Sequence, residues 1–261
     1  LHGGLVNLCR VLASHQYTAL QRQLERTLAC EAVFDEAAQW VAEHKDEAAL
    51  VAPSVIDVRG EHVQAAMYQF VVWWMGCGGM AGTDAKPRMS KRWGPGGGIC
   101  STRFAKAVAS CESIHNRLKK VDIRCMDLFD LLPKIKDQAG ITVYIDPPWR
   151  IGGKAYTFNW HQPAKAGVGG LFSADTKVRE TMELYQRLRD ALGRFKATRV
   201  VMRHEADASI QQLFSGSQWW TIGRPRNKGL TSAAGKAGGG SIDEMLILNQ
   251  PPIETNMKAG A

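Results

Sequence analysis

The sequence predicts an α/β protein with a mainly parallel sheet, because short apolar strands alternate with helical segments in its second half. Residues 141–145 are β-rich and apolar throughout, which is typical of a strand buried on both faces of a sheet. Of the 261 residues, 45% are hydrophobic and 22% are charged, as in most globular proteins. The longest apolar run, 70–75, is far below the roughly 18 residues of a membrane span. We therefore expect neither disorder nor a membrane-spanning segment.

The first 120 residues are mostly helical in pattern. Apolar residues recur at intervals of three and four, and the predicted helices cover residues 5–12, 18–44, 61–75 and 104–118. Two glycine-rich stretches, 76–82 and 94–98, enclose the basic run 86–93. The first stretch is followed by cations and more glycine instead of a helix, so we do not assign it as a nucleotide-binding loop.

From residue 121 the pattern changes to alternating strands and helices. We predict strands over residues 121–125, 141–145, 199–202, 219–223 and 245–248, and helices over 128–135, 176–195 and 210–214. The last two strands have no long helix between them, which allows them to form an antiparallel edge.

Lysine and arginine number 33 against 25 acidic residues, a formal charge of +8. This excess suits a polyanionic partner, although a basic protein without such a partner has the same composition. The six cysteines are far apart and form no Cys-x-x-Cys pair, and no histidines stand at ligand spacing. We expect no metal site, and reduced thiols in a cytoplasmic protein.

The residues with the clearest chemistry are Asp146, Pro147, Pro148 and Trp149, directly after the strand at 141–145. Ligands bind beyond the carboxyl ends of parallel strands. The prolines restrict the backbone, so the Asp146 carboxylate and the Pro147 carbonyl can point the same way. Two acceptors beside a flat aromatic ring suit the exocyclic amine of a nucleobase.

This Asp-Pro-Pro-aromatic motif resembles the signature of S-adenosylmethionine-dependent amino methyltransferases. More of the chain is similar to the Dam-like adenine-N6 DNA methyltransferases of phages and prophages, some of which belong to restriction-modification systems. Residues 4–12 resemble the helix after that family's second strand, 123–128 its cofactor-adenine strand, and 244–249 its closing strand. The resemblance implies a Rossmann-like methyltransferase sheet with a mostly helical inserted target-recognition region.

The family's phenylalanine-glycine-glycine-lysine segment and first glycine-rich loop are absent from these residues, so we expect the chain to continue upstream of Leu1. By resemblance, residues 1–16 end the cofactor-binding part, 17–120 form the target-recognition region, 121–250 form the catalytic core, and 251–261 are a tail. The family's DNA enzymes more often end the motif in tyrosine, whereas RNA adenine methyltransferases also use tryptophan.

The resemblance implies that the methyl group of S-adenosylmethionine is transferred to adenine N6 in double-stranded DNA. Asp146 and the Pro147 carbonyl would accept the N6 protons, and Trp149 would stack on the flipped base. Asp127 and Leu128, with Asp146, would contact the cofactor. Asp127 is equally well explained as the N-cap of a helix starting at Leu128.

The basic run supplies the candidate DNA contacts Arg88, Lys91, Arg92 and Trp93. Phosphate contacts position a protein without specifying sequence, and a solvated loop would have the same composition. The alternatives to the leading function are RNA adenine-N6 methylation, DNA cytosine-N4 methylation, and a non-catalytic nucleic-acid-binding remnant. The oligomeric state is not predicted, and a monomer is compatible with the sequence.

Overall fold

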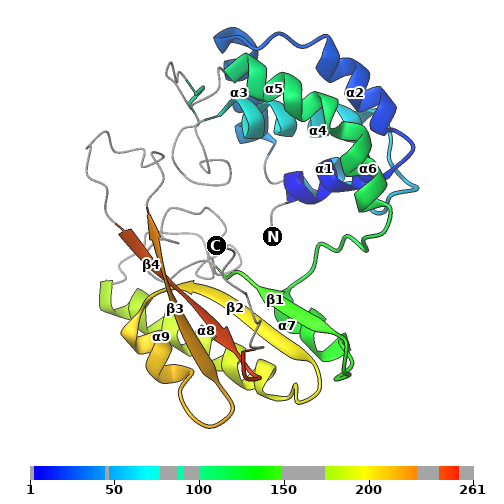
Figure 1. Cartoon of the computed structure of the whole chain (residues 1–261). Helices are drawn as coiled ribbons and strands as arrows, with labels where there is room; N and C mark the ends of the chain where they lie inside the picture. Colours follow the sequence, from blue (N-terminus) through cyan, green and yellow to red (C-terminus); the bar gives the residue numbers. More distant parts are fainter. Residues whose placement is uncertain are drawn as a thin grey trace, which may run out of the picture. The chain divides into compact units, whose positions relative to one another are not determined.

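The computed structural model of the chain describes residues 3–44, 47–76, 88–90, 100–147, 174–227 and 241–252. The chain divides into two compact units, Leu1–Met126 and Asp127–Ala261. The first unit is helical, and the second contains the sheet (Figure 1). The mixed α/β class predicted from the sequence is therefore confirmed. In the described part of the chain, no helix is both long and apolar enough to cross a membrane.

Helix α4 (Gly60–Met75) is the centre of the helical unit. It is apolar around most of its circumference, so it can be buried on several sides at once. The helices that pack against it are α1 (Gly3–Ala13), α2 (Tyr17–Glu25), α3 (Glu31–Glu43) and α5 (Cys100–Ala109). The short 3₁₀ helix η1 (Ala48–Leu50) also contacts α1 and α4. Residues 1–16, expected to end a cofactor-binding part, thus contribute α1 to this helical unit.

The helix expected over residues 18–44 is interrupted. Helix α2 ends at Glu25, and α3 begins at Glu31 after Cys30 in an extended conformation. Leu28, which continues the apolar spacing, lies in the connection and is 73% exposed. The turn lets Leu24 and Phe34, both fully buried, reach the same core from two helices.

The helix expected over residues 104–118 is also divided in two, into α5 and α6 (Cys111–Leu118). The break lies at Ser110, whose hydroxyl donates a hydrogen bond to the Lys106 carbonyl at 2.8 Å. Serine side chains that bond back to the preceding turn compete with the helical pattern. The two shorter helices both still contact α2.

The second unit contains a four-stranded sheet in the order β1-β2-β4-β3. The strands are β1 (Thr142–Ile145), β2 (Arg199–Glu205), β3 (Trp220–Asn227) and β4 (Ser241–Leu248). Strands β1 and β2 are parallel, whereas β4 lies between β2 and β3 and is antiparallel to both. The antiparallel edge that the sequence allows is confirmed. The expectation of a mainly parallel sheet is wrong for the described strands, because β4 enters against the direction of its neighbours.

Helix α8 (Ala174–Gly193) covers one face of this sheet together with α9 (Ala208–Leu213) and η2 (Leu132–Lys134) (Figure 1). Tyr185, Leu188 and Leu192 recur at helical spacing and are almost completely buried. They belong to one core with Val143 and Ile145 of β1. These contacts fix which face of each strand is turned toward the helices.

The opposite face of β1 is not buried in the described structure. Thr142 and Tyr144 are exposed while Val143 and Ile145 are buried, and the Tyr144 side chain is 58% exposed. The expectation of a strand buried on both faces is therefore wrong. Threonine and tyrosine carry hydroxyl groups that can remain in contact with water, so their presence in this segment is compatible with one solvent-exposed face.

The strand expected at residues 121–125 is absent, and the described chain is irregular there. Arg124 and Asp122 are exposed and pair with each other, with an Nε···Oδ2 distance of 2.7 Å. The helix expected over 128–135 is present as one turn of α7 (Leu128–Leu131) followed by η2.

Candidate functional site

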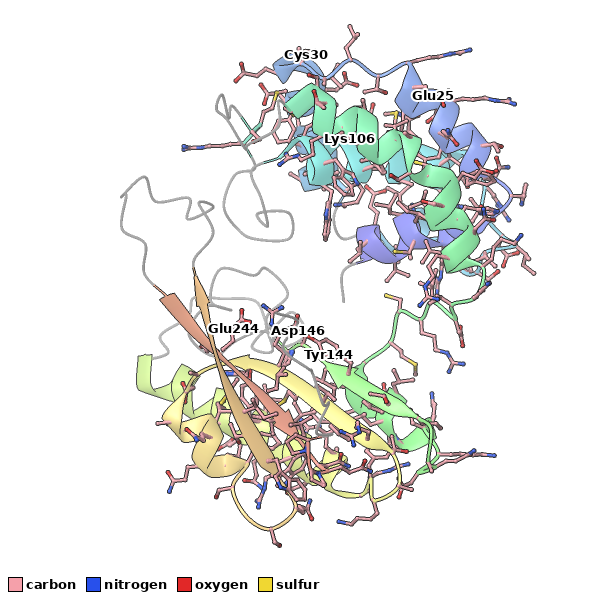
Figure 2. All side chains as sticks on the ribbon, viewed as in Figure 1. Glu25, Cys30, Lys106, Tyr144, Asp146 and Glu244 are labelled. Atoms are coloured by element: carbon pink, nitrogen blue, oxygen red, sulfur yellow. The ribbon has the colours of Figure 1, made fainter. Side chains whose placement is uncertain are left out.

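Asp146 lies at the carboxyl end of β1, where the parallel arrangement also brings the end of β2. Ile145 is paired with Met202, so the next position along each strand places Asp146 beside Arg203. The carboxylate of Asp146 is 46% exposed, and Figure 2 shows it at the same edge of the sheet as Glu244. This is the edge at which parallel α/β sheets bind their ligands.

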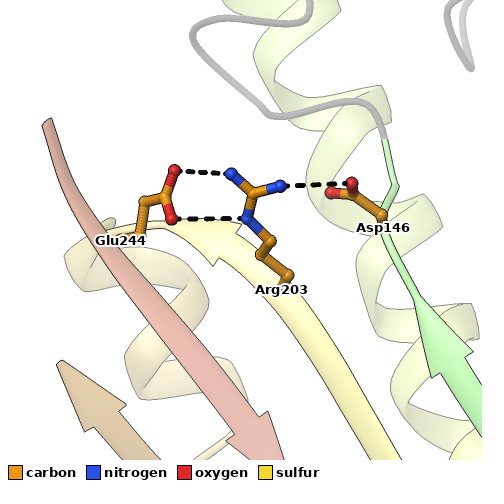
Figure 3. A network of polar contacts seen from close by, with 3 residues as sticks. All are labelled: Asp146, Arg203 and Glu244. Carbon is orange, nitrogen blue, oxygen red and sulfur yellow. Dashed lines mark hydrogen bonds and ion pairs between the residues drawn. The ribbon is translucent and has the colours of Figure 1, made fainter. Parts of the chain in front are cut away.

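Arg203 connects Asp146 to Glu244 on β4 (Figure 3). Its Nη2 donates to Glu244 Oε1 at 2.6 Å, and its Nε donates to Oε2 at 3.3 Å. Its Nη1 lies 3.6 Å from Asp146 Oδ2, a distance that makes an ion pair without a close hydrogen bond. The guanidinium is therefore bidentate toward Glu244, and its ion pair with Asp146 is longer.

Strand alternation explains why these three side chains meet. In β2, Val200, Met202 and His204 are buried under the helices, which leaves Arg203 on the opposite face. The antiparallel register pairs Arg203 with Leu246, so Glu244 is its diagonal neighbour two residues along β4. Such neighbours are within reach of a long side chain.

Burial differs across the network. The side chain of Glu244 is only 10% exposed, that of Arg203 is 27% exposed, and that of Asp146 is 46% exposed. The hydrogen bonds that Arg203 donates to Glu244, and then the charges of Glu244 and Asp146, raise the pKa of Arg203 above its ordinary value against the effect of its own burial. A permanent positive charge thus lies between two acidic groups.

Comparison of the sequence with known protein families and with curated proteins finds no match.

The structure describes only the first half of the proline motif. Pro147 follows Asp146 and is buried. Pro148 and Trp149 lie outside the described residues, so their expected roles stay predictions.

Asp127 has the N-cap geometry that one of its two interpretations required. Its backbone is extended, and its Oδ1 accepts a hydrogen bond from the Phe129 N–H at 2.7 Å, at the start of α7. This confirms the capping interpretation and leaves the cofactor role as a prediction, because a carboxylate has a second oxygen. Leu128 is partly buried against the core of the sheet unit, so its side chain supports the position of α7.

Arg88 is the one expected DNA contact within the described residues. It is exposed and precedes Met89, which forms an isolated bridge with Gly76, and the Ser90 N–H bonds to the Met75 carbonyl at 2.8 Å. Backbone contacts to the end of α4 therefore hold residues 88–90 in place. Lys91, Arg92 and Trp93 lie outside the described residues.

A buried polar pair lies on the other face of β2, next to Arg203 in sequence. His204 is fully buried, and its Nε2 lies 2.7 Å from the hydroxyl of Tyr185 on α8. Its Nδ1 lies 2.7 Å from the Glu205 carbonyl. A carbonyl only accepts, so Nδ1 carries a proton; in the neutral imidazole Nε2 then accepts from the tyrosine hydroxyl. This pair ties α8 to the end of β2 that carries Arg203.

Arg203 and Glu244 are the members of the site that the sequence analysis did not identify. A signal was present in β2, where three of the four alternate positions 199, 201, 203 and 205 carry a charged residue. In the described ranges, no group of three or more histidine, cysteine, aspartate or glutamate side chains could hold a metal ion. The five described cysteines are free thiols.

Proposed function

We propose that the protein is an S-adenosylmethionine-dependent methyltransferase that methylates N6 of adenine in DNA. The observation that carries the proposal is an oriented, half-exposed carboxylate at the carboxyl end of a parallel strand pair. The Asp-Pro-Pro-Trp motif begins at this carboxylate. The position of β4 inside the sheet supports the resemblance of 244–249 to the closing strand of a Rossmann-like methyltransferase sheet.

The amine of adenine is a donor, and the site presents acceptors to it. Asp146 would accept one N6 proton, and the carbonyl of Pro147 would accept the other. Hydrogen bonds to both protons favour a pyramidal N6 whose lone pair is no longer delocalised into the ring. The carboxylate also stabilises the positive charge that develops on this nitrogen, so positioning and electrostatics supply most of the rate.

S-adenosylmethionine, when bound, supplies an electrophilic methyl group on a sulfonium. The described residues fit such a molecule in two respects. Asp127 has an exposed carboxylate whose Oδ1 takes the helix cap, and its Oδ2 suits the adenine amine of the cofactor. Asp146 presents a half-exposed carboxylate at the edge of the sheet, which suits a cationic sulfonium better than an anionic ligand.

The DNA would have to present the adenine outside the duplex, at a cost of a few kcal/mol. We assign Trp149 to stacking on the flipped base, which returns roughly 1–3 kcal/mol. The formal charge of +8 supports a polyanionic substrate. Arg88, Lys91, Arg92 and Trp93 are the proposed backbone contacts.

The test uses the protein expressed from its complete reading frame in a host that lacks DNA methylation. Genomic DNA is digested to nucleosides and examined by mass spectrometry. We expect N6-methyladenine with the wild-type protein and none with Asp146→Ala. Asp190→Ala is the matched control, because it removes an exposed carboxylate on α8 whose described partner is Gln186.

The other outcomes each identify a different function. N4-methylcytosine would retain the amine chemistry and replace the base. Methyladenine in RNA alone would move the substrate from DNA to RNA. Absence of any methylated nucleoside, with DNA binding intact, would favour a non-catalytic remnant.

A further inference from the structure

The network at the end of the sheet divides one cation unequally between two carboxylates. Arg203 makes two hydrogen bonds with Glu244, at 2.6 and 3.3 Å, and one ion pair with Asp146 at 3.6 Å. A guanidinium prefers a bidentate, charge-assisted arrangement. Glu244 receives this arrangement, although Asp146 is within reach of the same group.

Burial explains the preference. The Glu244 side chain is 10% exposed, and a nearly buried carboxylate is unfavourable unless a cation is hydrogen-bonded to it. Asp146 is 46% exposed, so water can solvate it in the absence of ligand. Arg203 therefore makes its bidentate hydrogen bonds with Glu244, the more buried of the two carboxylates.

The consequence concerns the oxygens of Asp146. If the guanidinium fork faced Asp146, both carboxylate oxygens would be occupied and few acceptor positions would face a substrate. In the described structure the ion pair joins Arg203 Nη1 to Oδ2 of Asp146 at 3.6 Å, which is longer than a close hydrogen bond. The carboxylate keeps a defined orientation while retaining room to accept hydrogen bonds.

We propose that Arg203 and Glu244 are positioning residues for Asp146. Arg203 orients the carboxylate of Asp146, and Glu244 holds the guanidinium so that it does not form a bidentate pair with Asp146. The proposal rests on the proposed function, in which Asp146 accepts the amine of the base. It assigns a task to Glu244 that differs from cross-strand stabilisation. A residue that only stabilised the sheet would affect melting and leave the turnover of folded protein unchanged.

The variants separate these roles. Glu244→Gln keeps the shape and removes the charge that holds the guanidinium, so Arg203 should turn to Asp146. We expect kcat to fall about 100-fold, the effect of a misplaced reacting group, with KM for DNA unchanged. Adding Arg203→Met removes the cation that blocks Asp146, so the double variant should recover part of this loss. Arg203→Lys, with a point charge instead of a fork, should lower kcat roughly tenfold.

The matched control is Arg199→Met. Arg199 lies on the same strand and the same face as Arg203 but at the opposite end, where its side chain donates a hydrogen bond to the Pro251 carbonyl. The assay follows transfer of tritiated methyl from S-adenosylmethionine to genomic DNA of a methylation-deficient strain, with thermal melting of every variant. We expect wild-type kcat for the control.

The outcomes distinguish this proposal from the function on which it rests. Wild-type kcat in folded Glu244→Gln, or a double variant slower than Glu244→Gln, overturns the positioning role while Asp146-dependent methylation stands. If Glu244→Gln does not fold, Arg203→Lys decides: an unchanged kcat overturns the role, and a lower kcat at constant KM supports it. Methylation that survives Asp146→Ala, or is absent from the wild type, overturns the proposed function and this inference together.

Discussion

Replacing Asp127 with asparagine separates its capping role from its proposed cofactor role. The Phe129 N–H occupies Oδ1 of Asp127 at 2.7 Å. Asparagine caps helices as well as aspartate does, so its single oxygen would take over this bond. Its amide NH₂ would then lie where Oδ2 lies now, and a donor would face the donor amine of the cofactor's adenine.

The size of the effect follows from the bond that is lost. A hydrogen bond to a charged group contributes about 1.5–3 kcal/mol, which corresponds to a loss of roughly 10- to 150-fold in affinity. The melting temperature should not change, since the cap is retained. Asp127→Ala removes both roles, and the lost cap should add about 0.5–1 kcal/mol of destabilisation, at the low end for a helix of one turn.

The assay is isothermal titration of the protein with S-adenosylmethionine, beside thermal melting of the same samples. Asp130→Asn is the control, because it removes an exposed charge from the same turn. If Asp127→Asn binds the cofactor with the wild-type Kd, the cofactor role is wrong and Asp127 is only a cap.

Three further predictions concern the stability and chemistry of buried or bonded groups. Asn7 is fully buried, donates to the His62 carbonyl and accepts from the Ala52 N–H. Asn7→Asp would turn a carboxylate oxygen toward that carbonyl, so the free energy of unfolding measured in urea should fall by about 3 kcal/mol. An unchanged free energy of unfolding would contradict these hydrogen bonds. Burial raises the pKa of the Cys111 thiol to about 11 from its ordinary 9.0. At pH 8 the thiolate of Cys111 should therefore be about 100 times less abundant than in the unfolded chain, and iodoacetamide should react with it correspondingly more slowly. Equal rates of reaction in folded and urea-unfolded protein would refute this. The backbone N–H groups of Thr198, Lys196 and Ala197 lower the pKa of Asp137 below its ordinary 3.8, so the carboxylate stabilises the folded protein above pH 3.8 and this stabilisation is lost as the pH falls below that value. The Tm of Asp137→Asn should therefore lie below that of the wild type at pH 7, and by a smaller amount at pH 3. The same difference in Tm at both pH values would refute this.

The sequence was most informative where a single segment carries its own pattern. The apolar segment ending in Asp146 predicts both the strand and its carboxyl end, because side-chain type and the prolines act locally. The antiparallel pairing of β3 and β4 was also predictable, since no long helical segment separates them. Helix α4 matched its prediction to within one residue.

The partners of Asp146 were not predictable in the same way. Asp146, Arg203 and Glu244 come from three strands, and their contact depends on a parallel register on one side of β2 and an antiparallel register on the other. Neither register is visible in one sequence. The prediction of a strand at 121–125 was wrong for a related reason. Alternating apolar residues predict a strand, but they do not show whether a neighbouring strand is present to pair with it.

The order in which the chain enters the sheet has a consequence for biosynthesis. Strand β3 precedes β4 in sequence, yet it contacts the rest of the sheet only through β4. A ribosome that has completed β1, β2 and β3 has therefore produced a two-stranded sheet and an unattached strand. Glu244 arrives with the segment that joins them, so the guanidinium of Arg203 acquires its tighter partner at the same moment as the sheet is completed. A chain stopped before residue 241 would retain the Asp-Pro-Pro-Trp motif and lack the assembled site.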